Sequence, residues 1–183
     1  MWNAKHLSEV QPDFVSKTSF LWVHQNSLQI LADQKTLVGV EHNWDKNCSE
    51  IVIEDITNHE KGIPPIRIKQ HENQINNILL DEKNCCMFSG DDNGRVIQSY
   101  LDLQDNPGKV LKDYGKLGVG VIYSSIMLGD VAVFGGWNGT LGFIDSQKRE
   151  HLKNKFDMAP GVCLLYTSPS PRDLSTSRMP SSA

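Results

Sequence analysis

The sequence predicts an all-β fold that is assembled from repeated four-stranded antiparallel sheets. Two segments, 88–102 and 134–145, share one pattern: Phe, a small residue, Gly, a short step, Asn-Gly, an alternating apolar run and Asp. The Asn-Gly pairs of these segments lie 45 residues apart. A repeat of this length that is built from turns and short apolar runs indicates stacked supersecondary units. No window shows the apolar period of an amphipathic helix.

The same period extends toward the N-terminus. His71 in His-Glu-Asn-Gln-Ile is matched by His24 in His-Gln-Asn-Ser-Leu, 47 residues earlier, and Tyr114 takes the place of the histidine in the last copy. We therefore expect a repeat region over 24–162, divided into 24–70, 71–113 and 114–162. Whether the N-terminal segment 1–23 is part of a preceding unit stays open.

Turn sequences place the strands within each repeat. Asn-Gly is the strongest two-residue hairpin signal, because both central residues of a type I′ turn need positive φ. We expect Asn93-Gly94 and Asn138-Gly139 to form such turns, and Asp-Glu-Lys-Asn at 81–84 and Leu-Gly-Asp at 128–130 to connect other strands. The predicted strands are 28–32, 36–40, 50–56 and 66–69, then 75–80, 85–89, 95–101 and 109–112, then 119–125, 131–135 and 140–144.

A four-stranded unit of roughly 40–45 residues is the size of a propeller blade. From about His24 to Arg149 the pattern resembles the WD-repeat (WD40-like) family of β-propellers. His71 stands where the family has the histidine of a Gly-His pair. Ser89 to Gly94 resembles the family's Ser-Gly-Ser-x-Asp-Gly turn, and Leu141 to Asp145 resembles the strand that closes with Trp-Asp.

The resemblance implies a buried structural hydrogen-bond network around His71, Ser89 and Asp92. It is partial at most, because no copy carries the family's tryptophan and Tyr100-Leu101-Asp102 is one residue too long. Other blade types and a small β-sandwich stay open as alternative folds. The remaining structural positions that the repeat implies are Asn93, Gly94, Asp102, Asn138, Gly139 and Asp145.

Residues 163–183 resemble a translated sequencing-adapter sequence. The segments 163–173 and 177–183 match the shifted-frame translation of the two sides of a transposase library adapter, and Leu174-Ser175-Thr176 between them keeps the reading frame. A disordered Ser/Pro tail is the ordinary alternative. Because the frame agrees across both segments, we treat 163–183 as a non-native, disordered tail and exclude it from the fold.

The repeat count predicts an incomplete β-propeller. Closing a propeller takes roughly four or more blades, whereas the repeats account for about three WD40-like blades of four antiparallel strands each. We therefore expect a fragment of a longer WD-repeat protein, with the blade count, any domain beyond Val162 and the true start all open.

Composition excludes several kinds of partner. The formal net charge is −4, which argues against nucleic acid and against an anionic membrane surface, since both attract clustered Lys and Arg. No apolar run is long enough to cross a bilayer.

Outside the tail the cysteines are Cys48, Cys85 and Cys86, an odd number without a C-x-x-C spacing. This favours a reducing compartment, and we expect a cytoplasmic protein.

No pattern in the sequence predicts catalysis, a cofactor or a metal ion. Gly115, Gly118 and Gly120 are in the wrong order for the dinucleotide motif G-x-G-x-x-G. The six histidines never occur at a metal spacing such as H-x-x-x-H. We therefore predict a protein–protein interaction scaffold that is not an enzyme. The alternative is a β-propeller enzyme or small-ligand binder with a site in the central channel.

Four residues are candidates for contact with a protein or peptide partner. Trp44 and Trp137 occupy the same loop of the repeat, between the second and third strands, and in WD-like propellers this loop shares a face with the connections that carry His24 and His71. Tryptophan is enriched at interface hot spots. The competing interpretation is that each tryptophan folds back over its own hairpin.

Overall fold

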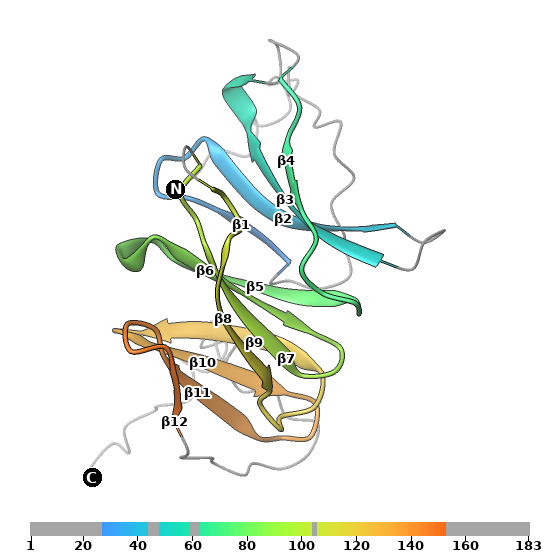
Figure 1. Cartoon of the computed structure of the whole chain (residues 1–183), viewed down its shortest axis with the longest axis vertical. Coiled ribbons are helices and arrows are strands. Elements are labelled where there is room, and N and C mark those ends of the chain that lie inside the picture. The colour runs from blue at the N-terminus through green and yellow to red at the C-terminus, as the bar shows by residue number, and fades with distance from the viewer. Residues whose placement is uncertain (1–26, 44–47, 59–62, 104–105, 153–183) are drawn as a thin grey trace, which may run out of the picture.

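A computed structural model describes residues 27–43, 48–58, 63–103 and 106–152. These residues form three four-stranded antiparallel sheets, stacked along the long axis of the molecule in Figure 1. Within each sheet the strands lie in chain order, so each sheet is a simple meander. This confirms the predicted all-β fold of about three four-stranded units.

The strands are three to eight residues long and alternate with turns. The first sheet holds β1 (Leu28–Ile30), β2 (Thr36–Asn43), β3 (Cys48–Asp55) and β4 (Ile66–Ile68); the second holds β5 (Ile75–Asp81), β6 (Cys86–Asp91), β7 (Arg95–Tyr100) and β8 (Val110–Lys116); the third holds β9 (Ile122–Leu128), β10 (Val131–Gly136), β11 (Leu141–Asp145) and β12 (Glu150–Leu152). Among the described residues, short 3-10 helices occur at η2 (Ile56–Asn58) and η3 (Glu82–Asn84).

Most strands differ from the predictions by a few residues at one or both ends, and the clearest differences are at β6, β9 and β12. Cys85 is not in a strand but ends η3 with a left-handed φ of 48°, so only Cys86 begins β6. β9 starts at Ile122 rather than at residue 119, because Gly118 and Gly120 take positive φ and turn the chain. β12 was not predicted, since its three residues have no apolar alternation.

The Asn-Gly hairpins are not the predicted type I′ turns. Only the glycine of each pair has a positive φ, 75° at Gly94 and 76° at Gly139. The N–H of Gly94 donates to the carbonyl of Asp91 at 3.0 Å, and that of Gly139 to the carbonyl of Gly136 at 3.1 Å. Each loop is therefore a tight turn followed by a left-handed glycine, the usual form of a three-residue hairpin.

Apolar side chains fill the two spaces between the sheets. Between the first and second sheets the buried cluster comprises Val38, Val40, Ile51, Ile53, Ile68, Ile75, Ile78, Met87 and Leu101. Between the second and third it comprises Leu79, Cys86, Phe88, Val96, Leu117, Val119, Ile122, Ala132, Phe134 and Ile144. The rings of Phe88 and Phe134 meet edge to face at 5.8 Å across the second space. Each sheet therefore buries its apolar surface against its neighbours, as stacked repeats do.

The first strand of the second sheet lies against both neighbouring sheets, since β5 contacts β1 and β2 on one side and β9 on the other. The two outer sheets also present apolar side chains of these strands to solvent. Leu28 and Ile30 on β1 are 44% and 53% exposed, and Ile126 and Leu128 on β9 are 41% and 61% exposed. Both ends of the stack thus expose apolar side chains, the same type of side chain that is buried between neighbouring sheets.

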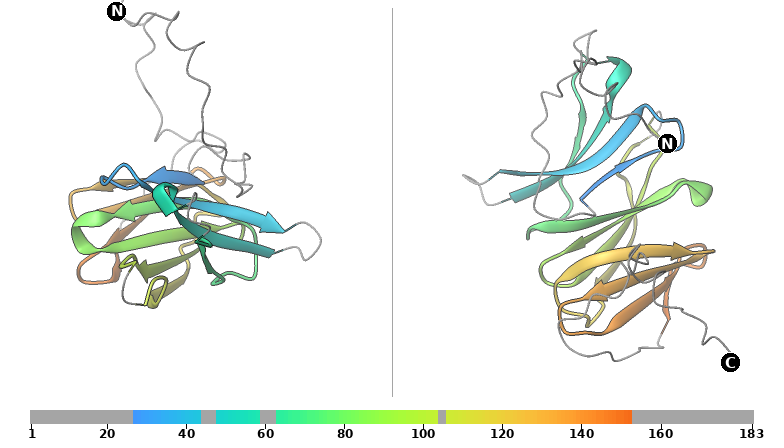
Figure 2. Two further views of the ribbon diagram at one scale, coloured as in Figure 1. Left: turned by 90° about the horizontal axis from the view of Figure 1, so that it is seen from above. Right: turned by 180° about the vertical axis from the view of Figure 1, so that it is seen from behind.

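Connections emerge at two opposite edges of the stack, to the right and left of Figure 1 and again visible from behind in Figure 2. The Trp137 face holds the β6–β7 and β10–β11 turns and the segments that lead into β5 and β9. The Cys85 face holds the β1–β2, β5–β6 and β9–β10 turns and the segments that leave β3, β7 and β11. Candidate functional residues occur on both faces.

Candidate functional site

His71 is the centre of a buried hydrogen-bond network on the Trp137 face. Its Nδ1 lies 2.9 Å from Oδ2 of Asp91, and its Nε2 lies 2.8 Å from Oγ of Ser89. Because a carboxylate only accepts hydrogen bonds, Nδ1 carries the proton and donates to Asp91. All three residues are at most 2% exposed. The network therefore fixes the segment before β5 to strand β6 of the same sheet.

Asp91 also organises the β6–β7 hairpin. Its Oδ1 accepts the backbone N–H groups of Asn93 and Arg95, both at 2.9 Å. Burial opposes the charged form of this carboxyl, but hydrogen bonds from His71 and from these two amides outweigh burial and hold the pKa of Asp91 below its ordinary value. The carboxylate thus joins a turn, a strand and a buried imidazole.

The aspartate of the network is Asp91, not Asp92 as the sequence pattern suggests. The side-chain oxygen of Asp92 instead accepts a hydrogen bond from the Asn76 amide. The difference follows from the turn type. In a three-residue loop the last strand residue is Asp91, whose side chain faces the interior, while Asp92 begins the loop and is exposed.

An Asp–His–Ser set of this connectivity is also that of a hydrolase triad. Here Ser89 is 1% exposed, Asp91 and His71 are equally buried, and neither of the two pockets described below is lined by any of them. A nucleophile needs space for a reacting atom beside it, and Oγ of Ser89 has none. The set therefore has a structural part in the second sheet.

Other predicted repeat positions lie in turns. The Asn138 side chain accepts the N–H of Thr140 at 3.1 Å within the β10–β11 loop. Asp145 ends β11 and accepts the N–H of Lys148 at 2.9 Å. Asp102 follows β7 and lines a pocket on the Cys85 face. These side chains order the connections locally.

Trp137 is the predicted partner-contacting residue that the structure places at the surface. Its side chain is 65% exposed, and its indole meets the Tyr123 ring edge to face at 5.9 Å with an interplanar angle of 60°. The backbone N–H of Trp137 donates to the carbonyl of Val121 at 2.9 Å. Tyr123 therefore supports one side of the indole, and most of the ring remains accessible.

Of the other three predicted contact residues, the structure describes only His71. His71 lies on the same face of the stack but is buried in its network, out of reach of a partner. Trp44 and His24 lie outside the described residues.

A second buried polar cluster, which the sequence did not suggest, connects the second and third sheets. The Ser146 hydroxyl donates to the Asp81 carboxylate, and the Gln98 amide donates to the Ser146 carbonyl at 3.1 Å. The Tyr114 hydroxyl donates to Oε1 of Gln98 at 2.7 Å. Burial raises the pKa of Tyr114 and also that of the neighbouring Cys86 thiol, so both stay protonated at neutral pH.

Replacing Ser146 by alanine should weaken this connection. Without the hydroxyl, the buried Asp81 carboxylate loses one donor, and we expect a loss of about 2 kcal/mol in the free energy of unfolding, measured by urea denaturation. Thr140→Ala is the control, because it removes a hydroxyl near the surface that bonds Asn138 in its own turn at 2.6 Å and contacts the Gly118 carbonyl only at 3.4 Å. Equal losses in the two variants would contradict a stabilising role for Ser146.

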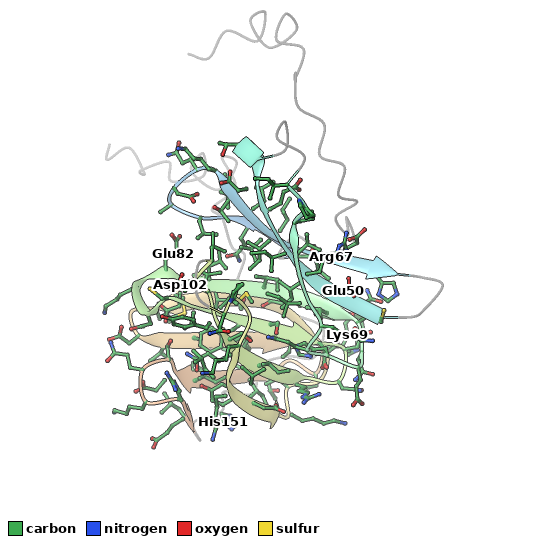
Figure 3. All side chains as sticks on the ribbon, turned by 45° about the horizontal axis from the view of Figure 1, so that its top comes forward. Glu50, Arg67, Lys69, Glu82, Asp102 and His151 are labelled. Carbon is green, nitrogen blue, oxygen red and sulfur yellow. The ribbon has the colours of Figure 1, made fainter. Side chains whose placement is uncertain are left out.

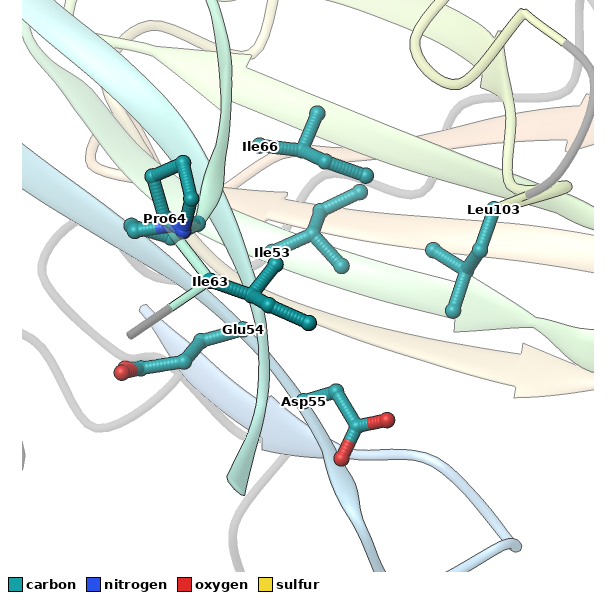
Figure 4. A pocket seen from close by; sticks show the side chains of 8 residues that line it. Ile53, Glu54, Asp55, Ile63, Pro64, Ile66 and Leu103 are labelled. Atoms are coloured by element: carbon teal, nitrogen blue, oxygen red, sulfur yellow. The ribbon is translucent and has the colours of Figure 1, made fainter. Parts of the chain in front are cut away.

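Two pockets open on the Cys85 face, at the seam between the first and second sheets. The first, of about 350 Å³, is lined by Ile53, Glu54, Asp55, Ile63, Pro64, Pro65, Ile66 and Leu103. Figure 4 shows it with Leu103 facing Ile53 and Ile66. The second, of about 380 Å³, is lined by Leu31, Glu82, Cys85, Leu101, Asp102 and Leu103. Neither was predicted, because their walls combine the ends of β3 and β4 with connections that lie far apart in the sequence.

The described residues contain no group of three or more His, Cys, Asp or Glu side chains that could hold a metal ion. Within the same ranges, no helix has the length and apolar character needed to span a membrane.

Comparison with solved structures identifies the fold, although neither a family model nor a curated protein matches the sequence. The WD40 domain of Toxoplasma gondii coronin aligns with a TM-score of 0.54 and 12% identity over 68% of this chain. A computationally designed protein, Ika8, aligns with a TM-score of 0.54 and 16% identity over 74%. The chain spans 33% of the coronin structure and 37% of Ika8. The three sheets are therefore blades of a WD40-like β-propeller.

Proposed function

We propose that this chain is a protein–protein interaction module with no chemistry of its own, part of a longer WD-repeat protein. One observation carries the proposal: Trp137 is 65% exposed at an edge of rigid, stacked blades. A large aromatic side chain on a hairpin turn can bury much apolar area in a partner at a small cost in conformational entropy. Loops on a rigid scaffold are also where binding residues concentrate.

Further blades would complete the ring of which these sheets form a part. This extension is supported by the apolar side chains at both ends of the stack, Leu28 and Ile30 on one side and Ile126 and Leu128 on the other. Their exposure matches what a neighbouring blade covers in the two interior spaces. We also place the module in the cytoplasm, since Cys48, Cys85 and Cys86 are free thiols.

Substituting Trp137 by alanine tests the interaction function. We expect the variant to lose a partner that the wild-type chain captures from a cell extract, and the purified partner to bind about thirtyfold or more weakly, as at a hot spot of about 2 kcal/mol. The free energy of unfolding should change by less than about 1 kcal/mol, because the ring is mostly solvated.

Leu128→Ala is the matched control, because Leu128 is 61% exposed on another part of the stack. It should leave capture of the partner unchanged. If Trp137→Ala kept the partner but lost stability, the indole would serve only to cover its own hairpin.

A further inference from the structure

The two pockets on the Cys85 face adjoin each other at the seam between the first two blades. They share a single wall, Leu103, so that a chain crossing this residue would enter both. With about 350 and 380 Å³ each, they lie at the lower end of the range for binding pockets. We call their combined surface the seam groove.

The floor of the seam groove is apolar and its border is acidic. Leu31, Leu101, Ile53, Ile66 and Leu103 supply apolar surface, and Ile63 stands 53% exposed at the rim. The charged residues at the border are Asp55, Glu82 and Asp102, and a fourth carboxyl group, that of Glu54, is buried; none of the lining residues is a cation. Figure 3 shows Glu82 and Asp102 on the same side of the molecule.

Among the described residues, the cations near the groove, Lys35 and Lys83, are engaged by other carboxylates. Lys83, next to Glu82, is paired with Asp130 at 2.7 Å. The charge of Lys35 lowers the pKa of two carboxyl groups, those of Asp33 and Asp55, so its attraction is shared between them. Hydrogen bonds from the Thr57 side chain and backbone lower the pKa of Asp55, so its carboxylate is charged at neutral pH. A ligand in the groove would therefore meet a negative potential beside an apolar floor.

Hydrogen bonds between the two blades hold the groove in shape. The Gln29 amide donates to the carbonyl of Ile78 at 2.6 Å and accepts the N–H of Leu80 at 3.2 Å. Both carboxylate oxygens of Glu82 accept the N–H of Ala32, at 3.1 and 3.0 Å. Because the walls are fixed before binding, a ligand would not have to order them.

Building on the proposed function, we propose that the seam groove binds a linear peptide segment of a partner protein that places two apolar side chains on either side of Leu103 and carries Lys or Arg beside them. The apolar floor of the groove matches the two apolar side chains of the segment, and the acidic border matches its Lys or Arg. This site is on the edge opposite to Trp137, so one module has two independent contact surfaces.

A defined peptide tests the groove directly. The probe is fluorescein-labelled Lys-Arg-Leu-Lys-Pro-Leu-Arg-Lys, titrated with the whole chain and followed by fluorescence anisotropy. We expect saturable binding that is lost when both leucines become alanine at unchanged charge. Equal binding of the alanine peptide would overturn the proposal, since attraction between opposite charges alone would explain it.

Matched variants locate the binding. Ile63→Ser should weaken the leucine peptide at least about tenfold, while Val110→Ser, at a similarly exposed apolar residue on β8 (47%), should have no effect. Glu82→Gln keeps an acceptor for Ala32 but removes a charge, and should weaken binding about threefold; Glu72→Gln on the Trp137 face should not. Equal affinities within either pair would place the peptide elsewhere.

Thiol labelling gives a second readout that does not depend on mutation. Cys85 is exposed and lines the groove, whereas Cys48 lies at the start of β3 near the other edge. The peptide should slow alkylation of Cys85 by iodoacetamide and leave that of Cys48 unchanged, as followed by peptide mapping. Equal rates at Cys85 with and without peptide would overturn the proposal.

The two proposals can fail separately. Trp137→Ala should leave peptide binding intact, because Trp137 is on the opposite edge. If no peptide binds but partner capture still depends on Trp137, the seam groove is wrong and the interaction function stands. If the peptide binds as expected and Trp137→Ala has no effect on partner capture, the contact through Trp137 is wrong and the groove remains.

Discussion

Asp91→Ala should destabilise the chain by about 3–5 kcal/mol, as expected when one partner of a buried, hydrogen-bonded pair is removed. The variant leaves the Nδ1–H of His71 buried without its acceptor and takes away the acceptor of the Asn93 and Arg95 amides. Urea denaturation, followed by the loss of β-sheet circular dichroism, measures the change.

The neighbouring carboxylate provides the control for this prediction. Asp92 is exposed and accepts a hydrogen bond from the buried Asn76 amide. Asp92→Ala removes the acceptor of this one donor, so it should cost about 1–2 kcal/mol, clearly less than Asp91→Ala. If Asp92→Ala were the more damaging variant, the network would be centred on Asp92, as the repeat pattern suggested, and the geometry around His71 would be wrong.

Asp91 should also shape the dependence of stability on pH. Its pKa is lower in the folded chain than in the unfolded chain, so below about pH 4 the unfolded state binds the extra proton. The stabilisation is complete above that pH and is lost as pH falls through the folded pKa. Asp91→Asn, compared with wild type between about pH 2 and pH 6, should show a shallower loss of stability toward acid.

The repeat pattern predicted those features of the fold that depend on residues close together in the sequence. It located His71 and Ser89, because these residues stand at fixed offsets from turns that glycine and asparagine define. It misplaced the aspartate by one position, because the offset depends on whether the hairpin loop has two or three residues. Both loops use a glycine at positive φ, so the Asn-Gly pair alone does not distinguish them.

Contacts between blades could not be predicted in the same way. Ser146 meets Asp81 and Gln98 only after two sheets stack, and nothing in their spacing distinguishes them from ordinary turn and strand residues. The walls of the seam groove likewise come from strand ends and connections whose residues meet only in the folded chain. Trp137 was identified as an unusual residue, but its exposure depends on how Tyr123 packs beside it.

Gly136 is a residue at which two segments of the chain approach each other closely. It ends β10 at an irregularity in the pairing with β9, and its φ is not in the left-handed region. A Cβ at this position would lie 1.8 Å from the carbonyl oxygen of Val119 and 2.9 Å from the Val119 Cβ. The glycine is therefore required for the close approach of the segment that leads into β9, and not for backbone freedom.

Gly136→Ala should accordingly cost at least about 3 kcal/mol in the free energy of unfolding, because a rigid backbone carbonyl, and not a flexible side chain, would have to move. Gly142→Ala in the adjacent strand is the control. There the nearest atom to an added Cβ is Cδ1 of Leu117 at 3.1 Å, which can turn away, so the loss should stay below about 1.5 kcal/mol.

Hydrogen exchange separates a local effect from failure of the whole fold. Val119 and Val121 connect the last two blades, and the carbonyl of Val121 holds the backbone of Trp137. In Gly136→Ala, amides of β9 to β11 should lose protection while those of β2 and β3 keep it, because the space between the first two sheets is intact. Uniform loss over both regions would mean that the blades unfold as one unit, and unchanged protection in β9 to β11 would mean that the Val119 segment yields without cost. The expected local loss would tie the exposed position of Trp137 to a residue that makes no contact with a partner.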